Sequence, residues 1–130
     1  MIFESSFTVR GYELDSFGHL NNSVYINYLE QARWDILRKN EDIYQYFTGN
    51  NVFLAVIETN IRYIREARIF DELLVKTRIE KENPYVNFFQ DIYNRKSNLK
   101  ISKAVVKTLL VDSERIPMDF PDEIFDKMNC

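Results

Sequence analysis

The chain has 130 residues and a mass of 15.6 kDa, which is the size of one ordinary domain. Its formal net charge is −3 at pH 7, and its basic residues are scattered among acidic ones, which argues against a protein that binds nucleic acid through a basic face. The only cysteine is Cys130, so neither an intrachain disulfide nor a metal site built on cysteines is expected. We expect a single domain over residues 1–130.

The sequence shows no targeting or membrane signal. The N-terminal stretch MIFESSFTVRGYELD has neither the basic start nor the apolar run of about 7–15 residues that a secretory signal needs. No later apolar run approaches the ~20 residues of a membrane-spanning helix. We therefore expect a cytoplasmic protein without a membrane partner.

The first two elements are a strand and a long helix. Apolar and polar residues alternate over residues 3–10, which is the period of a half-buried strand. From Val24 onward the apolar residues recur in steps of three and four, which predicts an amphipathic helix of about 16 residues. Good N-cap residues precede this helix, and cations stand where they favour its C-terminus. The apolar positions are Val24, Tyr25, Tyr28, Leu29, Ala32, Ile36 and Leu37; the caps are Asn21, Asn22 and Ser23; the cations are Arg38 and Lys39.

The remainder of the chain predicts four strands. After a polar turn at residues 48–51, alternation or apolar runs indicate strands at 53–64, 73–80, 85–93 and 101–111, with turns at 83–84 and 94–98. A short helical turn is expected near 123–128. The order predicts an α+β fold in which one helix packs on an antiparallel five-stranded sheet. Because one helix cannot cover such a sheet, and because an edge strand seeks a partner, we expect a homo-oligomer.

Residues 13–22 contain the side chains best suited to chemistry. This segment lies between the first strand and the helix, and it contains Glu13, Asp15, Gly18, His19, Asn21 and Asn22. Backbone N–H groups at a helix start have no intrahelical acceptor and carry partial positive charge, so they stabilise an oxyanion. The alternative is structural: an aspartate and a glycine that form a turn, an exposed histidine, and asparagines that cap the helix.

The longer sequence around this segment favours a catalytic role over a structural one. The sequence GHLNNSVYINYLEQAR after an acid-x-Asp resembles the hot-dog thioesterases of the 4-hydroxybenzoyl-CoA thioesterase family, whose pattern is Asp-x-Asp-x-x-Gly-His-Val-Asn-Asn followed by an aromatic-rich helix that ends in Glu-x-Ala-Arg. Glu13 replaces the first acid and Asp15 matches the second. The similarity continues more loosely over residues 61–73, where relatives often carry proline and glycine in a turn and this chain has Glu66 and Phe70. The other positions in register are Gly18, His19, Asn21, Asn22, Tyr25, Tyr28, Glu30, Ala32 and Arg33.

The resemblance implies a fold, a reaction and roles for individual residues. The fold would be the hot-dog fold, an antiparallel five-stranded sheet wrapped around one long helix, and the reaction would be hydrolysis of an acyl-CoA or acyl-carrier-protein thioester without a cofactor. Asp15 would either attack the thioester or activate a water molecule, and the sequence does not choose between these routes. A backbone N–H at or next to Asn22 would bind the carbonyl oxygen. Some relatives have a histidine at the Asn22 position, whereas here His19 is expected to organise the loop, with a role as an acid left open.

Substrate contacts are expected from the helix and the second strand. Asn21, Tyr25, Glu30 and Arg33 are candidates for the acyl pocket. The alternatives are a cap for Asn21, core packing for Tyr25, which its aromatic ring favours, and a surface ion pair for Glu30 and Arg33. Arg62, Arg65 and Arg68 form a basic alternation suited to the phosphates of coenzyme A, or simply a solvated strand face. We expect a homodimer or homotetramer with paired sites at the subunit interface.

Two other functions are compatible with the same fold. One is a module that binds acyl-CoA without turnover. The other, ranked last, is a dehydratase of 3-hydroxyacyl thioesters, which would need a histidine and an acid across the site, whereas the only histidine lies within the thioesterase-like string. Motifs for nucleotide phosphates, for zinc proteases and for the serine nucleophile elbow are absent from the sequence.

Overall fold

The computed structural model describes residues 1–129, so Cys130 and the expectation attached to it lie outside the described residues. The helices lie near the two ends of the chain, and the middle consists of four long consecutive strands. The elements are β1 (Phe3–Thr8), the 3₁₀ turn η1 (Gly11–Glu13), α1 (Asn22–Arg38), α2 (Glu41–Asn50), β2 (Phe53–Tyr63), β3 (Glu72–Glu82), β4 (Tyr85–Asn94), β5 (Lys100–Val111), β6 (Pro117–Met118) and α3 (Asp122–Met128).

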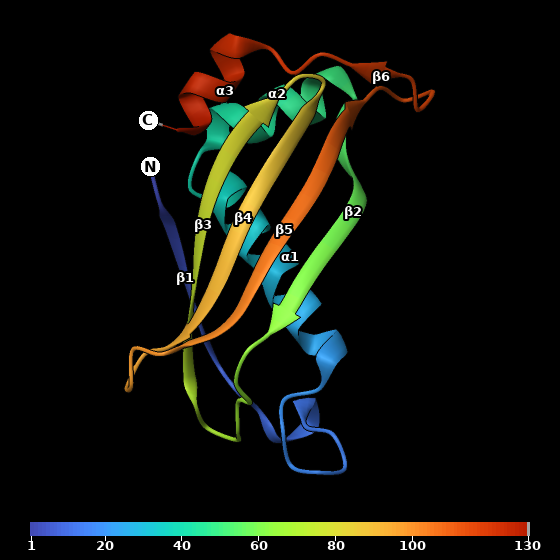
Figure 1. The fold of residues 1–130 in the computed structure, drawn as a ribbon. Coiled ribbons are helices and arrows are strands. Elements are labelled where there is room, and N and C mark those ends of the chain that lie inside the picture. Colours follow the sequence, from blue (N-terminus) through green and yellow to red (C-terminus); the bar gives the residue numbers. More distant parts are fainter. Residues whose placement is uncertain (130) are drawn as a thin grey trace.

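All strands belong to one antiparallel sheet in the order β1-β3-β4-β5-β2 (Figure 1). As expected, the first strand pairs with one far away in sequence, because Phe3 lies opposite Thr77 in β3. The two-residue strand β6, which the sequence did not predict, pairs with the end of β5. β1 and β2 are therefore the two edges of the main sheet.

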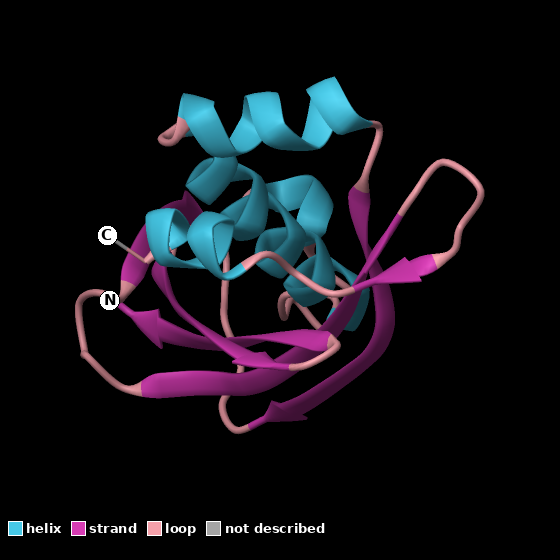
Figure 2. Ribbon diagram, turned by 90° about the horizontal axis from the view of Figure 1, so that it is seen from above, coloured by secondary structure: helices cyan, strands magenta, loops and turns pink. Residues whose placement is uncertain are grey.

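Helix α1 packs against the concave face of this sheet. Figure 2 shows the strands as a curved band with the helices on one side of it. Alternate residues of β3, β4 and β5 point inward and meet the apolar side of α1, as the period of two in strands and of 3.6 in helices requires. The expected α+β arrangement of a sheet curved around one long helix is confirmed. The side chains that α1 buries are Tyr25, Tyr28, Leu29, Ala32 and Ile36.

The helix α2 was not predicted, and the polar turn expected at residues 48–51 is wrong in part. Residues 48–50 form the last turn of α2, and the chain reverses at Asn51, which has a φ of 52°. The side chain of Asn40 caps the start of α2 by accepting a hydrogen bond from the N–H of Ile43 (3.4 Å). Ile43 and Phe47, one helical turn apart, are the residues that α2 buries.

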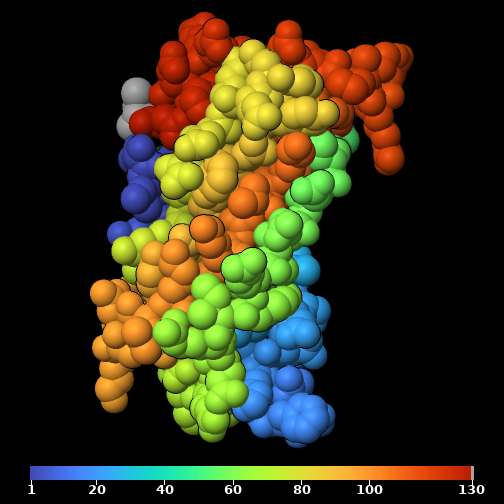
Figure 3. Space-filling model, in the orientation of Figure 1, coloured from blue at the N-terminus to red at the C-terminus, as the bar shows by residue number. Residues whose placement is uncertain are grey.

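The edge strand β2 exposes one backbone edge and most of its side chains. Within residues 1–129 its 11 residues pair with β5 and with no other strand, and most of its side chains are exposed on both faces. Figure 3 shows the green residues of β2 along the right margin of the uncovered sheet. The large exposed apolar side chains in and just after β2 are Phe53, Val56, Ile57, Tyr63 and Ile64.

Replacing Ile43 tests whether α2 is part of the core. Ile43 is 1% exposed, so Ile43→Ala should lower the free energy of unfolding by about 2–5 kcal/mol, as deletion of buried methyl groups usually does. The exposed neighbour Gln45 provides the matched control, and Gln45→Ala should change stability by less than about 0.5 kcal/mol. Urea unfolding measures both, and equal effects would contradict a buried α2.

Candidate active site

Glu13 anchors the segment that leads to α1. Its side chain is 6% exposed and its Oε1 accepts hydrogen bonds from the hydroxyl of Tyr28 (2.6 Å) and from the backbone N–H of Arg10 (2.9 Å). Burial and the bond to Glu13 both raise the pKa of Tyr28. The backbone carbonyl of Glu13 also accepts from the N–H of Asn21 (2.9 Å). The first acid of the motif therefore fixes both ends of the loop from a buried position.

Asp15 organises the loop between η1 and α1. Its Oδ1 accepts hydrogen bonds from the N–H groups of Phe17 (2.9 Å) and His19 (3.1 Å), and its own N–H donates to the carbonyl of His19 (2.8 Å). Gly18 has a φ of 78°, the left-handed conformation that closes this turn. The other carboxylate oxygen, Oδ2, accepts no hydrogen bond from residues 1–129. One oxygen of Asp15 thus holds the loop, and one is left to act on a ligand. The loop lies at the lower end of the molecule in Figure 1.

The same loop occurs a second time in the chain. The Oδ1 of Asp112 accepts from the N–H groups two and four residues further on (2.9 Å each), and Arg115, with a φ of 65°, takes the place of Gly18. The N–H of Asp112 donates to the carbonyl of Ile116 (3.1 Å), as in the Asp15 loop. The loop shape alone therefore defines no active site. The two loops differ in the elements they lead to, because the Asp112 loop runs into β6 and the Asp15 loop runs into the start of α1.

The start of α1 supplies the second half of the site. Asn21 is the N-cap, and its side-chain oxygen accepts from the N–H of Ser23 (3.1 Å). The N–H of Asn22, the first helical residue, makes no hydrogen bond to any residue within 1–129. A free N–H at the positive end of a 17-residue helix is suited to binding a negatively charged or polarised oxygen. Asn21 is thus primarily a cap, which leaves only its amide nitrogen for the substrate contact expected from the sequence.

The imidazole of His19 is paired with the carboxylate of Glu66. Its Nε2 lies 3.0 Å from Oε2 of Glu66, and its backbone pairs with Arg68 in a short antiparallel bridge. A hydrogen bond from Arg68 lowers the pKa of Glu66, and the nearby His19 contributes less to the same shift. These contacts agree with His19 as an organiser of the loop, and they bring the turn at residues 65–70 against the Asp15 loop.

Tyr25 lies in the core rather than at an open pocket. It is 3% exposed and its ring packs edge-to-face on that of Tyr63 in β2, with 5.0 Å between the centroids. Burial raises its pKa to about 12. The hydroxyl of Tyr63 donates to the backbone carbonyl of Asn22 (3.2 Å), so these two tyrosines attach the end of β2 to the start of α1.

Glu30 and Arg33 line a cavity within a single subunit, whereas the sequence predicted sites at a subunit interface. This cavity, about 600 Å³ in volume, lies between α1, α2 and the beginning of β2, and we call it the α1–β2 cavity. Its size is within the range of small-molecule sites. Helix geometry puts Arg33 ~17 Å along α1 from Asn22, so the cavity and the Asp15 loop are at different ends of the helix. Residues that line it include Glu30, Arg33, Trp34, Tyr44, Phe53 and Phe88.

The three arginines near the end of β2 have different surroundings. Arg62 is exposed on β2 itself. A guanidinium nitrogen of Arg65 donates to the carbonyl of Lys100 (2.7 Å), and Arg68 is paired with Glu66, which raises the pKa of Arg68. Arg62 and Arg65 are thus the arginines of this group whose charge no carboxylate meets within residues 1–129.

Two absences apply to residues 1–129. No group of three or more His, Cys, Asp or Glu side chains is placed to hold a metal ion. None of the helices combines the length and the hydropathy needed to cross a membrane.

The comparisons with solved structures define the class of fold. A probable thioesterase from Escherichia coli, YbaW, is 29% identical with a TM-score of 0.88, and the match covers 97% of this chain and 96% of that one. Slr0204, a 1,4-dihydroxy-2-naphthoyl-CoA thioesterase from Synechocystis, has a TM-score of 0.87 at 16% identity over 100% and 96% of the two chains, which shows the fold alone. The fold expected from the resemblance, the hot-dog fold of thioesterases, is confirmed.

The family follows from the sequence comparisons. A model of the thioesterase-like superfamily matches residues 9–128, and the chain belongs to this superfamily. The long-chain acyl-CoA thioesterase FadM from Escherichia coli is 39% identical over 80 residues, which are 62% of this chain and 60% of that protein. The acyl-acyl carrier protein thioesterase ATL3 from Arabidopsis thaliana is 28% identical over 125 residues, 95% of this chain and 66% of that one. The chain thus spans less than two thirds of the length of these relatives.

Gly18 and Gly49 form a matched pair that tests the geometry of the loop. A Cβ at either position would meet nothing within 4 Å, so only backbone conformation distinguishes them. Gly18→Ala should lower the free energy of unfolding by about 1–2 kcal/mol because its φ is positive, whereas Gly49→Ala, inside α2, should raise it by about 0.5–1 kcal/mol. Urea unfolding of both variants measures the difference, and effects of the same sign would contradict the loop described here.

Proposed function

We propose that the chain hydrolyses acyl thioesters of coenzyme A or of an acyl carrier protein. One observation carries the proposal: the carboxylate of Asp15 is fixed through one oxygen, with the other oxygen left over, in the loop that leads to the unpaired N–H at the start of α1. Membership in the thioesterase-like superfamily supports the choice of substrate class. So do the activities named for FadM and ATL3.

The proposed chemistry uses the two halves of the site together. The N–H of Asn22 binds the thioester carbonyl oxygen and stabilises the negative charge that develops on it, an effect that typically contributes about 3–4 kcal/mol to lowering the barrier. Asp15 either attacks the carbonyl carbon to form an anhydride, which water then cleaves, or accepts a proton from the attacking water. In both routes the C–S bond breaks. In the first route the thiolate takes its proton from water, and in the second Asp15 returns to the sulfur the proton that it accepted from the attacking water. His19 keeps the loop in place through Glu66.

Completion of the site by a second subunit follows from the open edge of β2. An 11-residue exposed edge with apolar side chains is a template for strand pairing. If two copies pair antiparallel about a two-fold axis near the middle of β2, Tyr63 of one copy lies opposite Phe53 of the other. The Asp15 loop is attached to Tyr63 through Asn22, and Phe53 lines the α1–β2 cavity. We therefore propose a homodimer, or a tetramer of such dimers, in which each cavity receives the acyl group of the thioester at the partner's Asp15.

Roles for the remaining predicted residues follow from this arrangement. Glu30 and Arg33 belong to the cavity wall, whereas Tyr25 supports the start of α1 from within the core. Arg62 is the last residue but one of β2, and Arg65 follows the strand just before Glu66, which pairs with His19 of the loop. Their charges suit the phosphates of coenzyme A.

The repeated loop provides an internal control for the catalytic test. Asp15→Asn should lower kcat/KM for thiol release from acyl-CoA by at least about 100-fold, because an amide is neither a base nor a nucleophile. Asp112→Asn removes a carboxylate from the same hydrogen-bond pattern and should leave kcat/KM unchanged. The assay is free-thiol release from a panel of aliphatic and aromatic acyl-CoAs. Turnover by Asp15→Asn at the wild-type rate would rule out the mechanism, and binding without turnover by the wild type would identify a binding module.

A charge on either edge of the sheet tests the dimer. Ile57 on β2 is 49% exposed, and Ile57→Lys should shift the protein toward monomer because it places charge in the proposed interface. Thr8→Lys puts the same charge on the other edge, β1, and should leave the oligomeric state unchanged. Sedimentation equilibrium of the three proteins distinguishes these outcomes, and a monomeric wild type would contradict the shared site.

A further inference from the structure

The α1–β2 cavity contains a charge that its apolar walls do not explain. Most of the wall consists of aromatic and aliphatic side chains from α1, α2, β2 and β4, including Phe88, which is 3% exposed. Arg33 projects from α1 into this environment, and its guanidinium carbon lies 5.9 Å from the centre of the Phe88 ring. Burial lowers the pKa of Arg33, but a guanidinium remains charged in proteins.

The partners of Arg33 leave most of its donors unused. One nitrogen, Nη1, donates to the side-chain oxygen of Gln90 in β4 (2.9 Å), and no carboxylate of residues 1–129 lies within 4.0 Å. Gln90 is fully buried, and its own N–H groups donate to the carbonyl of Leu29 (3.0 Å) and the hydroxyl of Thr77 (3.1 Å). Gln90 therefore fixes the direction of Arg33, and four of the five N–H donors of its guanidinium have no partner among residues 1–129.

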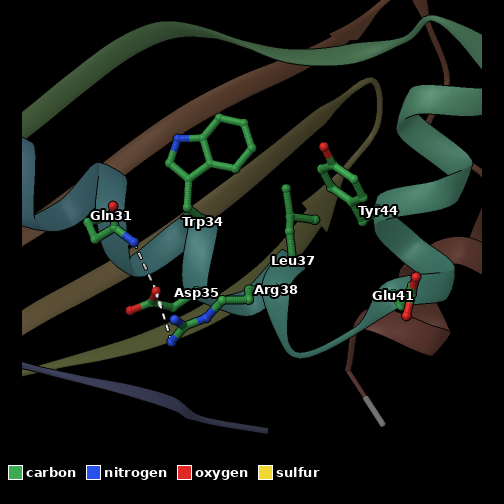
Figure 4. A pocket seen from close by; sticks show the side chains of 7 residues that line it. All are labelled: Gln31, Trp34, Asp35, Leu37, Arg38, Glu41 and Tyr44. Carbon is green, nitrogen blue, oxygen red and sulfur yellow. Dashed lines mark hydrogen bonds and ion pairs between the residues drawn. The ribbon is translucent and has the colours of Figure 1, made fainter.

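The neighbouring surface groove shows the opposite arrangement. This groove of about 570 Å³ shares Trp34, Leu37 and Tyr44 with the cavity and is drawn in Figure 4. Its one cation, Arg38, lies 3.6 Å from Asp35, which also accepts from Gln31 (2.9 Å), and the carboxylate of Glu41 lines the same groove. Among residues 1–129, the cation of the groove is therefore paired with a carboxylate, whereas Arg33 in the cavity is not.

We propose that the α1–β2 cavity selects acyl groups that carry a ketone or hydroxyl oxygen along the chain, and that this oxygen accepts a hydrogen bond from Arg33. The proposal rests on the thioesterase function proposed above. A plain hydrocarbon chain that fills the cavity would exclude water from the free N–H groups of Arg33 without replacing its hydrogen bonds, which is unfavourable. A neutral oxygen fits better than a terminal carboxylate, because the carboxylate of Glu30 stands one turn before Arg33 on the same wall.

Trp34 reports on the cavity directly. It is the only tryptophan in the chain and lines both the α1–β2 cavity and the neighbouring groove, so its fluorescence responds to an occupant of either one independently of hydrolysis. Dependence of the response on Arg33, which lines the cavity and not the groove, assigns it to the cavity. The experiment titrates the Asp15→Asn protein with pairs of acyl-CoAs of equal chain length, one plain and one with a ketone or hydroxyl, over a series of substituent positions. For at least one position the oxygenated compound should bind about tenfold more tightly or better.

Substitutions at Arg33 and Arg38 assign this preference to a residue. Arg33→Met, combined with Asp15→Asn, should remove the difference between the members of a pair. Arg33→Lys, which keeps the charge but lacks the planar fork, should retain part of it and carries the test if the Met variant does not fold. Arg38→Met removes a charge from the same helix outside the cavity and should leave the preference intact.

The outcomes separate this proposal from the proposed function. Equal affinity within every pair, a preference that survives Arg33→Met, or no fluorescence response to any acyl-CoA would overturn the proposal about Arg33. Absence of thiol release by the wild type would overturn the hydrolase, while the titration would still measure what the cavity selects. Tighter binding of the oxygenated compounds that depends on Arg33 would support the proposal in either case.

Discussion

The burial of one side of α1 in the curved sheet determines where the functional parts of the molecule lie. Five side chains of α1 are buried, which fixes the helix along the concave face. Its start is attached to the end of β2 by the contacts of Tyr25 and Tyr63, and its second half forms the α1–β2 cavity with α2 and the beginning of β2. The free N–H and the cavity are therefore at different positions along a rigid helix. Within one subunit the Asp15 loop and the start of α1 are adjacent, and the cavity is at the other end of the helix.

The Asp15 loop has a geometry that recurs elsewhere in the chain, so its hydrogen-bond pattern alone does not define a site. Asp112 closes a turn with the same hydrogen bonds and the same left-handed residue conformation, yet it lies beside a two-residue strand. What distinguishes Asp15 is its attachment to the helix start, and Glu13 secures this attachment from the core by accepting from Tyr28 and Arg10. The chemistry proposed for Asp15 thus depends on the buried carboxylate of Glu13, which holds the loop in place.

Sequence periodicity was sufficient to predict α1 and the long strands, because each presents a regular pattern of apolar residues. The loop before α1 was marked instead by a dense motif. Periodicity missed α2, where Ile43 and Phe47 are the buried residues of ten and the rest of the segment is polar or exposed. It also left Arg33 open between a surface pair with Glu30 and a pocket residue. That choice depends on Gln90, which lies 57 residues further along the chain and meets Arg33 only after the sheet has curved around the helix. Contacts of this kind have no local signal in a single sequence.

The central claim is that Asp15 of one subunit acts on a thioester whose acyl group occupies the cavity of the other. Subunit mixing tests it most directly: Asp15→Asn is denatured and refolded together with Thr48→Trp, which fills the cavity from α2, so that mixed dimers form. Each variant alone should be inactive. In a two-fold dimer one site of each mixed pair combines the intact Asp15 with the intact cavity, so the mixture should recover about a quarter of the wild-type activity. A mixture that forms mixed dimers but stays inactive would contradict the claim and place both functions within one subunit.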